Sequence, residues 1–191
     1  LATEYAVHLA PDCKANLLLF NSFYVPVTVT VDGGVYPSYY GQYEEFEKES
    51  TEKLKLLSGH LGNAKVKCGI DEPEIRYQNK MGSLEEGLRS LVGPSAFWMI
   101  VIGNKSKDNF ISRLVFGSES SQVLQHANCP VLMVNEDALF TPFKRITFAV
   151  DTFNAETKNA LRFLVQLGSV YSLDIDVVHI SPKTYDARKN T

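Results

Sequence analysis

The amino-acid sequence predicts an α/β fold in which a doubly wound parallel sheet carries helices on both faces, followed by the start of a second copy. Short apolar runs alternate with longer segments whose apolar residues recur at helical spacing. The run Ala96–Ile102 is almost entirely apolar, as in a strand covered on both faces. With 191 residues, 45% of them hydrophobic, the chain is long enough to bury a core without a disulfide or a metal.

Two strands and two helices are expected in the first part of the chain. The apolar run Lys14–Ser22 begins soon after a proline and predicts a buried strand, and Ala64–Ile70 is expected to form a second short strand. Phe23–Ser38 is rich in Val, Gly, Pro and Thr and is expected to be an ordered loop. Apolar residues recur at the spacing of one helical face in Tyr39–Leu61 and Gly82–Gly93.

Strands and helices continue to alternate through the rest of the chain, which favours parallel pairing. Ala96–Ile102 is expected at the centre of the sheet and, after a polar loop and a short helix, Pro130–Asn135 at its edge. Asp137–Lys144 is expected to be a linker. A strand, a helix and a strand are then predicted at Arg145–Asp151, Ala155–Tyr171 and Leu173–Ser181.

The two ends of the chain resemble each other, which indicates an internal repeat. Leu1–Ser22 resembles Ala160–Ser181, each being the end of a helix followed by a strand. Only the second copy has a strand ahead of its helix. We therefore predict a nearly complete domain at residues 1–136 and a partial second domain at residues 145–191.

A strand ending in glycine, a loop and a short helix precede a distinctive apolar run. The strand ends at Gly103, the loop leads to Gly117 and Ser118, and the apolar run is Cys129–Val134. This arrangement resembles the universal stress protein family, whose loop is written G-x2-G-x9-G-[S/T] and whose last strand follows it. The resemblance extends over Leu1–Asn135, and the fold that it implies is the Rossmann-like, adenine-nucleotide-binding type.

The resemblance implies that this loop holds the phosphates of ATP. Glycines let the backbone approach an anion, and exposed N–H groups at a helix start point at phosphate oxygens. It also implies that an aspartate closing the opening strand helps to hold the nucleoside; here that aspartate is Asp151, and the likeness continues over Arg145–Ser181. On the phosphate side the matching positions are Gly103, Asn104, Lys105, Ser106, Gly117, Ser118 and Ser120.

Three departures from the family's loop act on the phosphate end. Ser106 replaces the second glycine, and residues 107–116 make the loop one residue longer. Glu119 places a carboxylate in the first turn of the following helix, where it repels a phosphate. Since Asp151 also belongs to the other domain, we expect weak or absent ATP binding, whereas a phosphate or sulfate ion can still bind at Gly117–Ser118.

Each candidate residue also has a purely structural interpretation. Ser118 and Ser120 are common helix N-caps, and Gly103 can simply end a strand. Asp151 can form an Asx-turn or cap the helix that begins near Ala155. The four histidines and three cysteines show no metal-binding or catalytic spacing and are expected to be structural.

The apolar edge strand predicts self-association, because an open strand edge is a template for pairing. The resemblance implies that the pairing occurs through this strand, either in a homodimer or in an intramolecular tandem pseudo-dimer. The residues of this edge are Val131, Leu132, Met133 and Val134.

The resemblance also places an opening strand, for which nothing precedes Leu1, between the strands at 14–22 and 96–102. Unpaired backbone groups on both sides of such a gap are costly when buried. Either the natural chain continues upstream, or Arg145–Asp151 of this or a second chain fills the gap.

Composition argues against several classes of function. The net charge is −3 and no basic run is present, so a nucleic-acid partner is not expected. No stretch approaches the ~20 apolar residues of a spanning helix, so no membrane association is expected. The cysteines fit a reducing, cytoplasmic setting. No nucleophile elbow, Walker loop or paired acid motif is present, so we do not expect an enzyme.

These observations predict a cytoplasmic stress-response protein that acts by dimerisation or partner binding, with a degenerate ATP- or phosphate-binding loop. The alternative is a member of the family that binds ATP or AMP and signals through the nucleotide. A nucleotide hydrolase ranks last, because Asp108 is the only candidate base or metal carboxylate near the loop.

Overall fold

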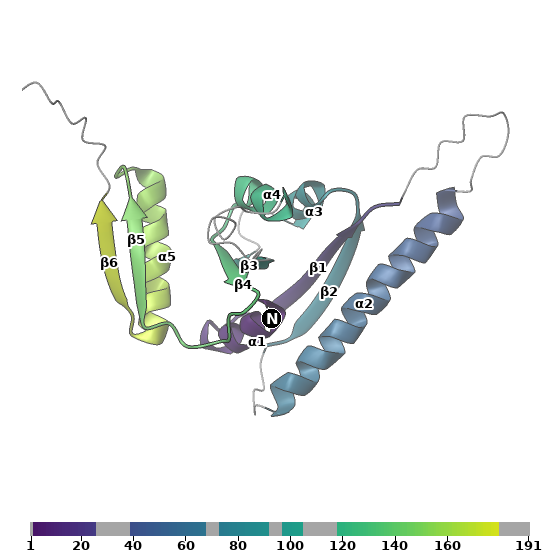
Figure 1. The fold of residues 1–191 in the computed structure, drawn as a ribbon, viewed down its shortest axis with the longest axis horizontal. Helices are drawn as coiled ribbons and strands as arrows, with labels where there is room; N and C mark the ends of the chain where they lie inside the picture. The colour runs from purple at the N-terminus through teal and green to yellow at the C-terminus, as the bar shows by residue number, and fades with distance from the viewer. Residues whose placement is uncertain (1, 26–38, 68–72, 92–96, 105–117, 180–191) are drawn as a thin grey trace, which may run out of the picture. The chain divides into compact units, whose positions relative to one another are not determined.

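The computed structural model describes residues 2–25, 39–67, 73–91, 97–104 and 118–179 (Figure 1). The chain divides into two compact units, Leu1–Phe140 and Thr141–Thr191, here called unit 1 and unit 2. The predicted loop at Phe23–Ser38 lies for the most part outside the described residues. Among the helices described, none is long and apolar enough to cross a membrane.

Unit 1 alternates helices with strands, beginning with a helix. Its elements are α1 (Ala2–Asp12), β1 (Leu17–Phe23), α2 (Tyr39–Lys67), β2 (Ile75–Met81), α3 (Leu84–Leu91), β3 (Ile100–Asn104), α4 (Ser118–His126) and β4 (Val131–Asn135). Unit 2 is a strand–helix–strand unit made of β5 (Arg145–Val150), α5 (Ala155–Tyr171) and β6 (Asp174–His179). The predicted alternation of strands and helices is confirmed.

All the strands described pair in parallel, as the α/β class requires, but they pair in twos. β1 pairs with β2, β3 with β4, and β5 with β6. The expected central position of Ala96–Ile102 stays a prediction: its strand, β3, has β4 as its one partner among the described strands. Filling of the gap by Arg145–Asp151 of this or a second chain stays a prediction. Within unit 2, one edge of β5 pairs with β6, and the single crossover through α5 keeps the entropic cost of closing this pair low.

The strand predicted at Ala64–Ile70 is wrong, because the strand that follows α2 is largely exposed and lacks an apolar run. Residues 64–67 of the expected strand Ala64–Ile70 form the last turn of α2, and the strand that follows is β2. β2 reads IRYQNKM and is largely exposed, so it lacks the apolar run by which a buried strand is recognised.

β1 is covered by a helix on each face. Successive strand residues point to opposite faces. Leu19 packs in the core cluster with Leu54 of α2, whereas the ring of its neighbour Phe20 lies against Gly87 of α3. A Cβ built on Gly87 would come within 2.5 Å of that ring, so this crossing requires glycine. The prediction of helices on both faces is confirmed for this strand.

The core of unit 1 lies between α1, α2 and β1. Each fully buried leucine or valine contributes about 1.5–3 kcal/mol relative to exposure. Helix α1 also contacts β3 and β4, so it packs on both parallel pairs of the unit. The buried residues of this cluster are Val7, Leu19, Leu54 and Leu61.

A polar network fixes α2 over the β1–β2 pair. Asn21 and Asn79 are register partners on the two strands. The Asn21 amide donates to the buried Ser50 hydroxyl at 2.9 Å, and the Asn79 amide donates to the Thr51 hydroxyl at 2.7 Å and to the Glu47 carbonyl at 3.2 Å. Buried polar groups need such partners, so the network specifies how the helix sits on the strands.

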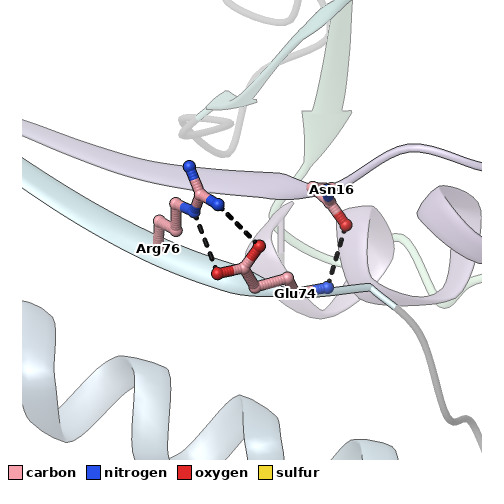
Figure 2. Close-up of polar contacts among 3 residues, drawn as sticks. All are labelled: Asn16, Glu74 and Arg76. Atoms are coloured by element: carbon pink, nitrogen blue, oxygen red, sulfur yellow. Dashed lines mark hydrogen bonds and ion pairs between the residues drawn. The ribbon is translucent and has the colours of Figure 1, made fainter.

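The amino ends of β1 and β2 are joined by the contacts drawn in Figure 2. The Glu74 backbone N–H donates to the Asn16 side chain at 3.1 Å. The Arg76 guanidinium donates twice to the Glu74 carboxylate, at 3.0 and 2.9 Å, and these hydrogen bonds lower the pKa of Glu74. Ligands of parallel sheets bind at the opposite, carboxyl ends, so this cluster is structural.

Unit 2 has well-defined helix ends. Asn154 is the N-cap of α5, its side-chain oxygen accepting from the Thr157 N–H at 2.8 Å. Ser172 ends the helix in the left-handed conformation. Gly168 faces Ile175 of β6, where an added Cβ would make an ordinary contact at 3.6 Å. That this unit is a partial second copy of the first domain, over residues 145–191, stays a prediction.

Candidate functional site

The described part of the candidate phosphate site lies at the carboxyl ends of β3 and β4. Gly103 is the fourth residue of β3, and the strand continues through Asn104, so the glycine does not end it. A Cβ built on Gly103 would lie 3.6 Å from that of Ala2, an ordinary contact. The first turn of α1 therefore lies against the end of β3, and the backbone at Gly103 does not itself demand glycine.

Two asparagines meet at this edge. Asn104 and Asn135 are register partners at the ends of β3 and β4. Asn104 is buried, and its amide nitrogen donates to the Asn135 side-chain oxygen at 3.4 Å. Sequence reasoning missed Asn135, although both asparagines share a recognisable signal: each is the first polar side chain after an apolar run.

The loop itself falls in 105–117, so Lys105, Ser106 and Gly117 lie outside the described residues. Ser118 is the first residue of α4, followed by Glu119 in its first turn. Ser120 is 9% exposed, so its side chain is packed within unit 1. A phosphate that contacted Ser120 would have to displace that packing, which favours the structural interpretation of this serine.

Asp151 lies in unit 2, directly after β5. Its carboxylate accepts from the backbone N–H of Thr152 at 2.7 Å and from the hydroxyl of the same residue at 3.2 Å. An Asx-turn joins residues two apart, and the helix cap is Asn154, so neither structural alternative for Asp151 is correct in its expected form. The side chain is exposed at the carboxyl end of a parallel strand.

The predicted dimer edge is strand β4. Val131, Leu132 and Met133 are half-buried, and Val134 is buried. One edge of the strand pairs with β3, and among the strands described none pairs with its other edge. Pairing of that edge with another molecule or with unit 2 remains a prediction.

Three of the four histidines have structural partners. His8 stacks on Phe140 with ring centroids 5.0 Å apart, His126 lies 3.3 Å from the Glu85 carboxylate, and the His179 ring is hydrogen-bonded to a carbonyl of β5. Within the described ranges, no three His, Cys, Asp or Glu side chains gather as metal ligands.

Two cysteines are described, and both are half-buried free thiols. Burial, with a smaller contribution from the Asp12 charge, raises the pKa of Cys13 to about 11. Burial likewise raises the pKa of Cys129. Both shifts favour the protonated thiol over the reactive thiolate. Cys68 lies outside the described residues.

Comparison with known proteins agrees with this geometry. The model of the universal stress protein family matches residues 1–135. Universal stress protein G of Shigella flexneri and that of Escherichia coli O157:H7 are each 30% identical over 91 residues, which is 48% of this chain and 58% of each relative. The chain thus spans somewhat more than half the length of these relatives.

A solved structure shows the same fold. Universal stress protein UspA from Lactobacillus plantarum superposes with a TM-score of 0.51 at 18% identity, covering 70% of this chain and 86% of that protein. At this identity the likeness concerns the Rossmann-like fold alone. Because the family model covers well over half of the sequence, this chain belongs to the universal stress protein family.

Proposed function

We propose that this chain acts in a stress response through self-association or partner binding, with weak or absent ATP binding. One observation carries the proposal: the two halves of the expected nucleotide site belong to different compact units. Gly103 and Ser118 lie in unit 1, whereas the aspartate expected to hold the nucleoside, Asp151, lies in unit 2.

The electrostatics at the phosphate end support weak binding. Glu119 lies in the first turn of α4, where a carboxylate complements the helix dipole but repels an incoming phosphate. The repulsion between two unit charges at 4 Å is about 1 kcal/mol in water and larger in a drier cleft. A small anion bound to the N–H groups at the start of α4 remains compatible with this arrangement.

Two properties of β4 support partner binding through this strand: its side chains are apolar, and it pairs with β3 along one edge. Among the described strands β4 has one unpaired edge, and a strand with such an edge and the side chains Val131 to Val134 is suited to pairing with a second strand. The partner is a second copy of the chain or, in a tandem pseudo-dimer, unit 2. A cytoplasmic location is part of the same proposal.

A nucleotide-dependent function is the second candidate. The carboxyl ends of β3 and β4, with the paired amides of Asn104 and Asn135, are where parallel α/β sheets bind ligands. Under this alternative the chain binds ATP or AMP and signals through the nucleotide.

Calorimetric titration with ATP and ADP separates the two candidates. We expect the unmodified chain to show no micromolar binding, and Glu119→Val to strengthen binding by up to roughly tenfold, the equivalent of 1.4 kcal/mol. Glu156→Val is the matched control, because it removes the same charge from the first turn of α5. Micromolar binding by the unmodified chain would favour the nucleotide-dependent function. An unchanged affinity in Glu119→Val would show that the charge is not the cause.

Light scattering combined with amide exchange tests self-association. We expect either a dimer or a compact tandem monomer, with slow exchange at those amides of Val131–Asn135 that face away from β3. A monomer in which these amides exchange rapidly contradicts pairing through β4.

A further inference from the structure

Strand β2 has one edge that no other described strand covers. Its seven residues, Ile75–Met81, pair with β1 along one edge, and among the strands described none pairs with the other. Such an edge presents a row of backbone N–H and C=O groups and is a template for pairing with another chain. Strand β4, the predicted dimer edge, is open in the same way, so the side chains must decide which of the two edges self-associates.

The face of β2 that lies toward α2 favours the addition of a further strand. Successive side chains of a strand point to opposite faces. Ile75 packs against the core cluster, and Tyr77 lies on the same face as its register partner Leu19. Tyr77 and Met81 nevertheless remain 40% and 50% exposed, so apolar surface is left for an added strand to cover.

The opposite face of β2 carries two cations. Arg76 and Lys80 lie four residues apart on that face, with Gln78 between them. The Arg76 side chain is 70% exposed, and its two hydrogen bonds with Glu74 hold it beside the strand. Lys80 is half-buried. Strand β4, by contrast, has the sequence VLMVN and carries no charge.

A second copy that pairs through the open edge of β2 brings these cations together. When two β2 strands pair antiparallel about a two-fold axis, the register that matches all seven residues sets Gln78 opposite Gln78. Arg76 of each copy then lies opposite Lys80 of the other, and like charges directly opposite destabilise a strand pair. The nearest slipped registers avoid these contacts but leave two residues of each strand unpaired.

We propose that Arg76 and Lys80 block the pairing of β2 with a second copy of the chain, which leaves the apolar edge of β4 for self-association. The proposal rests on the proposed function for the role of β4, whereas the block at β2 stands without it. A molecule with two self-pairing edges grows into an open chain of copies, while a single self-pairing edge stops at a dimer. The two cations thus protect the protein from open-ended assembly.

Light scattering of the full chain with single charge changes tests this block. Lys80→Gln removes both like-charge contacts, because Lys80 takes part in each, and it leaves the contact between Glu74 and Arg76 in place. We expect its average mass to rise roughly twofold above that of the unmodified chain at equal concentration. Lys80→Glu should associate more strongly still, since each introduced carboxylate faces Arg76 of the other copy.

Lys55→Gln and Lys55→Glu are the matched controls. Lys55 is exposed on α2, so these variants make the same changes of net charge away from the β2 edge. Neither control should change the average mass. A rise in the controls equal to that in the Lys80 variants would overturn the proposal, because net charge alone would then explain the association.

Amide exchange locates the new contact. In Lys80→Gln, the β2 amides that face away from β1 should become protected, whereas protection along Val131–Asn135 reports pairing through β4 separately. Failure of the proposed function therefore appears at β4, and failure of the block appears at β2. Arg76→Gln removes the same two contacts and keeps the test decisive if Lys80→Gln does not fold. An unchanged mass in either folded variant would overturn the proposal.

Discussion

In unit 1, strand β1 has α2 on one face and α3 on the other, whereas in unit 2 the helix described against the β5–β6 pair is α5 alone. The consequence is visible in the side chains. Unit 1 encloses a leucine and valine cluster, while the buried apolar residues described in unit 2 are Val150 and Leu167. Large apolar side chains that remain exposed in unit 2 are Phe153, Val165, Val170, Val177 and Val178.

The comparison shows that a strand–helix–strand unit is enough to pair two strands in parallel but does not by itself enclose a hydrophobic core. Both units form parallel pairs with full register. Enclosure comes from further helices that cover the remaining surface, because a sheet must bury both faces to exclude water from its apolar side chains. The predictions below use matched residues in the two units to test this difference.

The largest loss of stability is expected from truncating one buried leucine to alanine in each unit. Leu54 and Leu167 are almost equally buried, at 6% and 5% exposure. Leu54→Ala should cost roughly 3–4 kcal/mol, because Val7, Leu19 and Leu61 enclose the cavity that it leaves. Leu167→Ala should cost about 2 kcal/mol, because its surroundings can relax or admit water. Denaturant-dependent hydrogen exchange, resolved for each unit, measures both losses, and equal losses would contradict the difference in enclosure.

The next largest change in stability is expected when a helix glycine is replaced by alanine, and its sign should be opposite in the two units. Gly87→Ala pushes a methyl group into the Phe20 ring at 2.5 Å and should cost about 1–3 kcal/mol. Gly168→Ala makes only ordinary contacts with Ile175 and Leu173, so helix propensity should stabilise unit 2 by up to about 1 kcal/mol. Thermal unfolding of both variants provides the measurement. A stabilising Gly87→Ala would show that α3 shifts freely on β1.

Much of this fold could be predicted because most of its strands are short apolar runs in the sequence. β1, β3, β4 and β5 are apolar runs, and their positions were predicted to within a few residues. β2 could not be found in this way, since its side chains are largely exposed and its place depends on pairing with β1. The pairing of strands in twos depends on which edges meet in space, which no local pattern contains.

The candidate site was predictable in part for the same reason. Gly103 and Asn104 follow an apolar run, so their position at a carboxyl strand end could be inferred. The contact between Asn104 and Asn135 joins residues 31 apart and requires the register of β3 on β4. Likewise, the burial of Ser120 depends on packing that its helix-start position does not reveal.

The smallest effect is expected from the exposed ion pairs that each unit places beside the start of its strands. In unit 1, Arg76 holds Glu74 with two hydrogen bonds of 3.0 and 2.9 Å, whereas in unit 2 Arg145 lies 3.7 Å from Asp174. Exposed pairs contribute little unless their geometry is bidentate, so Glu74→Gln should lower the unfolding midpoint slightly and Asp174→Asn should leave it unchanged.

The pH dependence of the Glu74 pair gives this last prediction its sign. Its hydrogen bonds with Arg76 lower the folded-state pKa of Glu74 below the unfolded value. The pair therefore stabilises the fold above the unfolded pKa, near 4.3, and this contribution is lost as the pH falls through the lower, folded-state value. The stability difference between the unmodified chain and Glu74→Gln should thus be present at neutral pH and shrink in acid. A difference that stays constant from neutral pH down through that acidic window would show that the Glu74 side chain acts through its shape and that its charge contributes nothing, since the backbone contact with Asn16 is kept in Glu74→Gln.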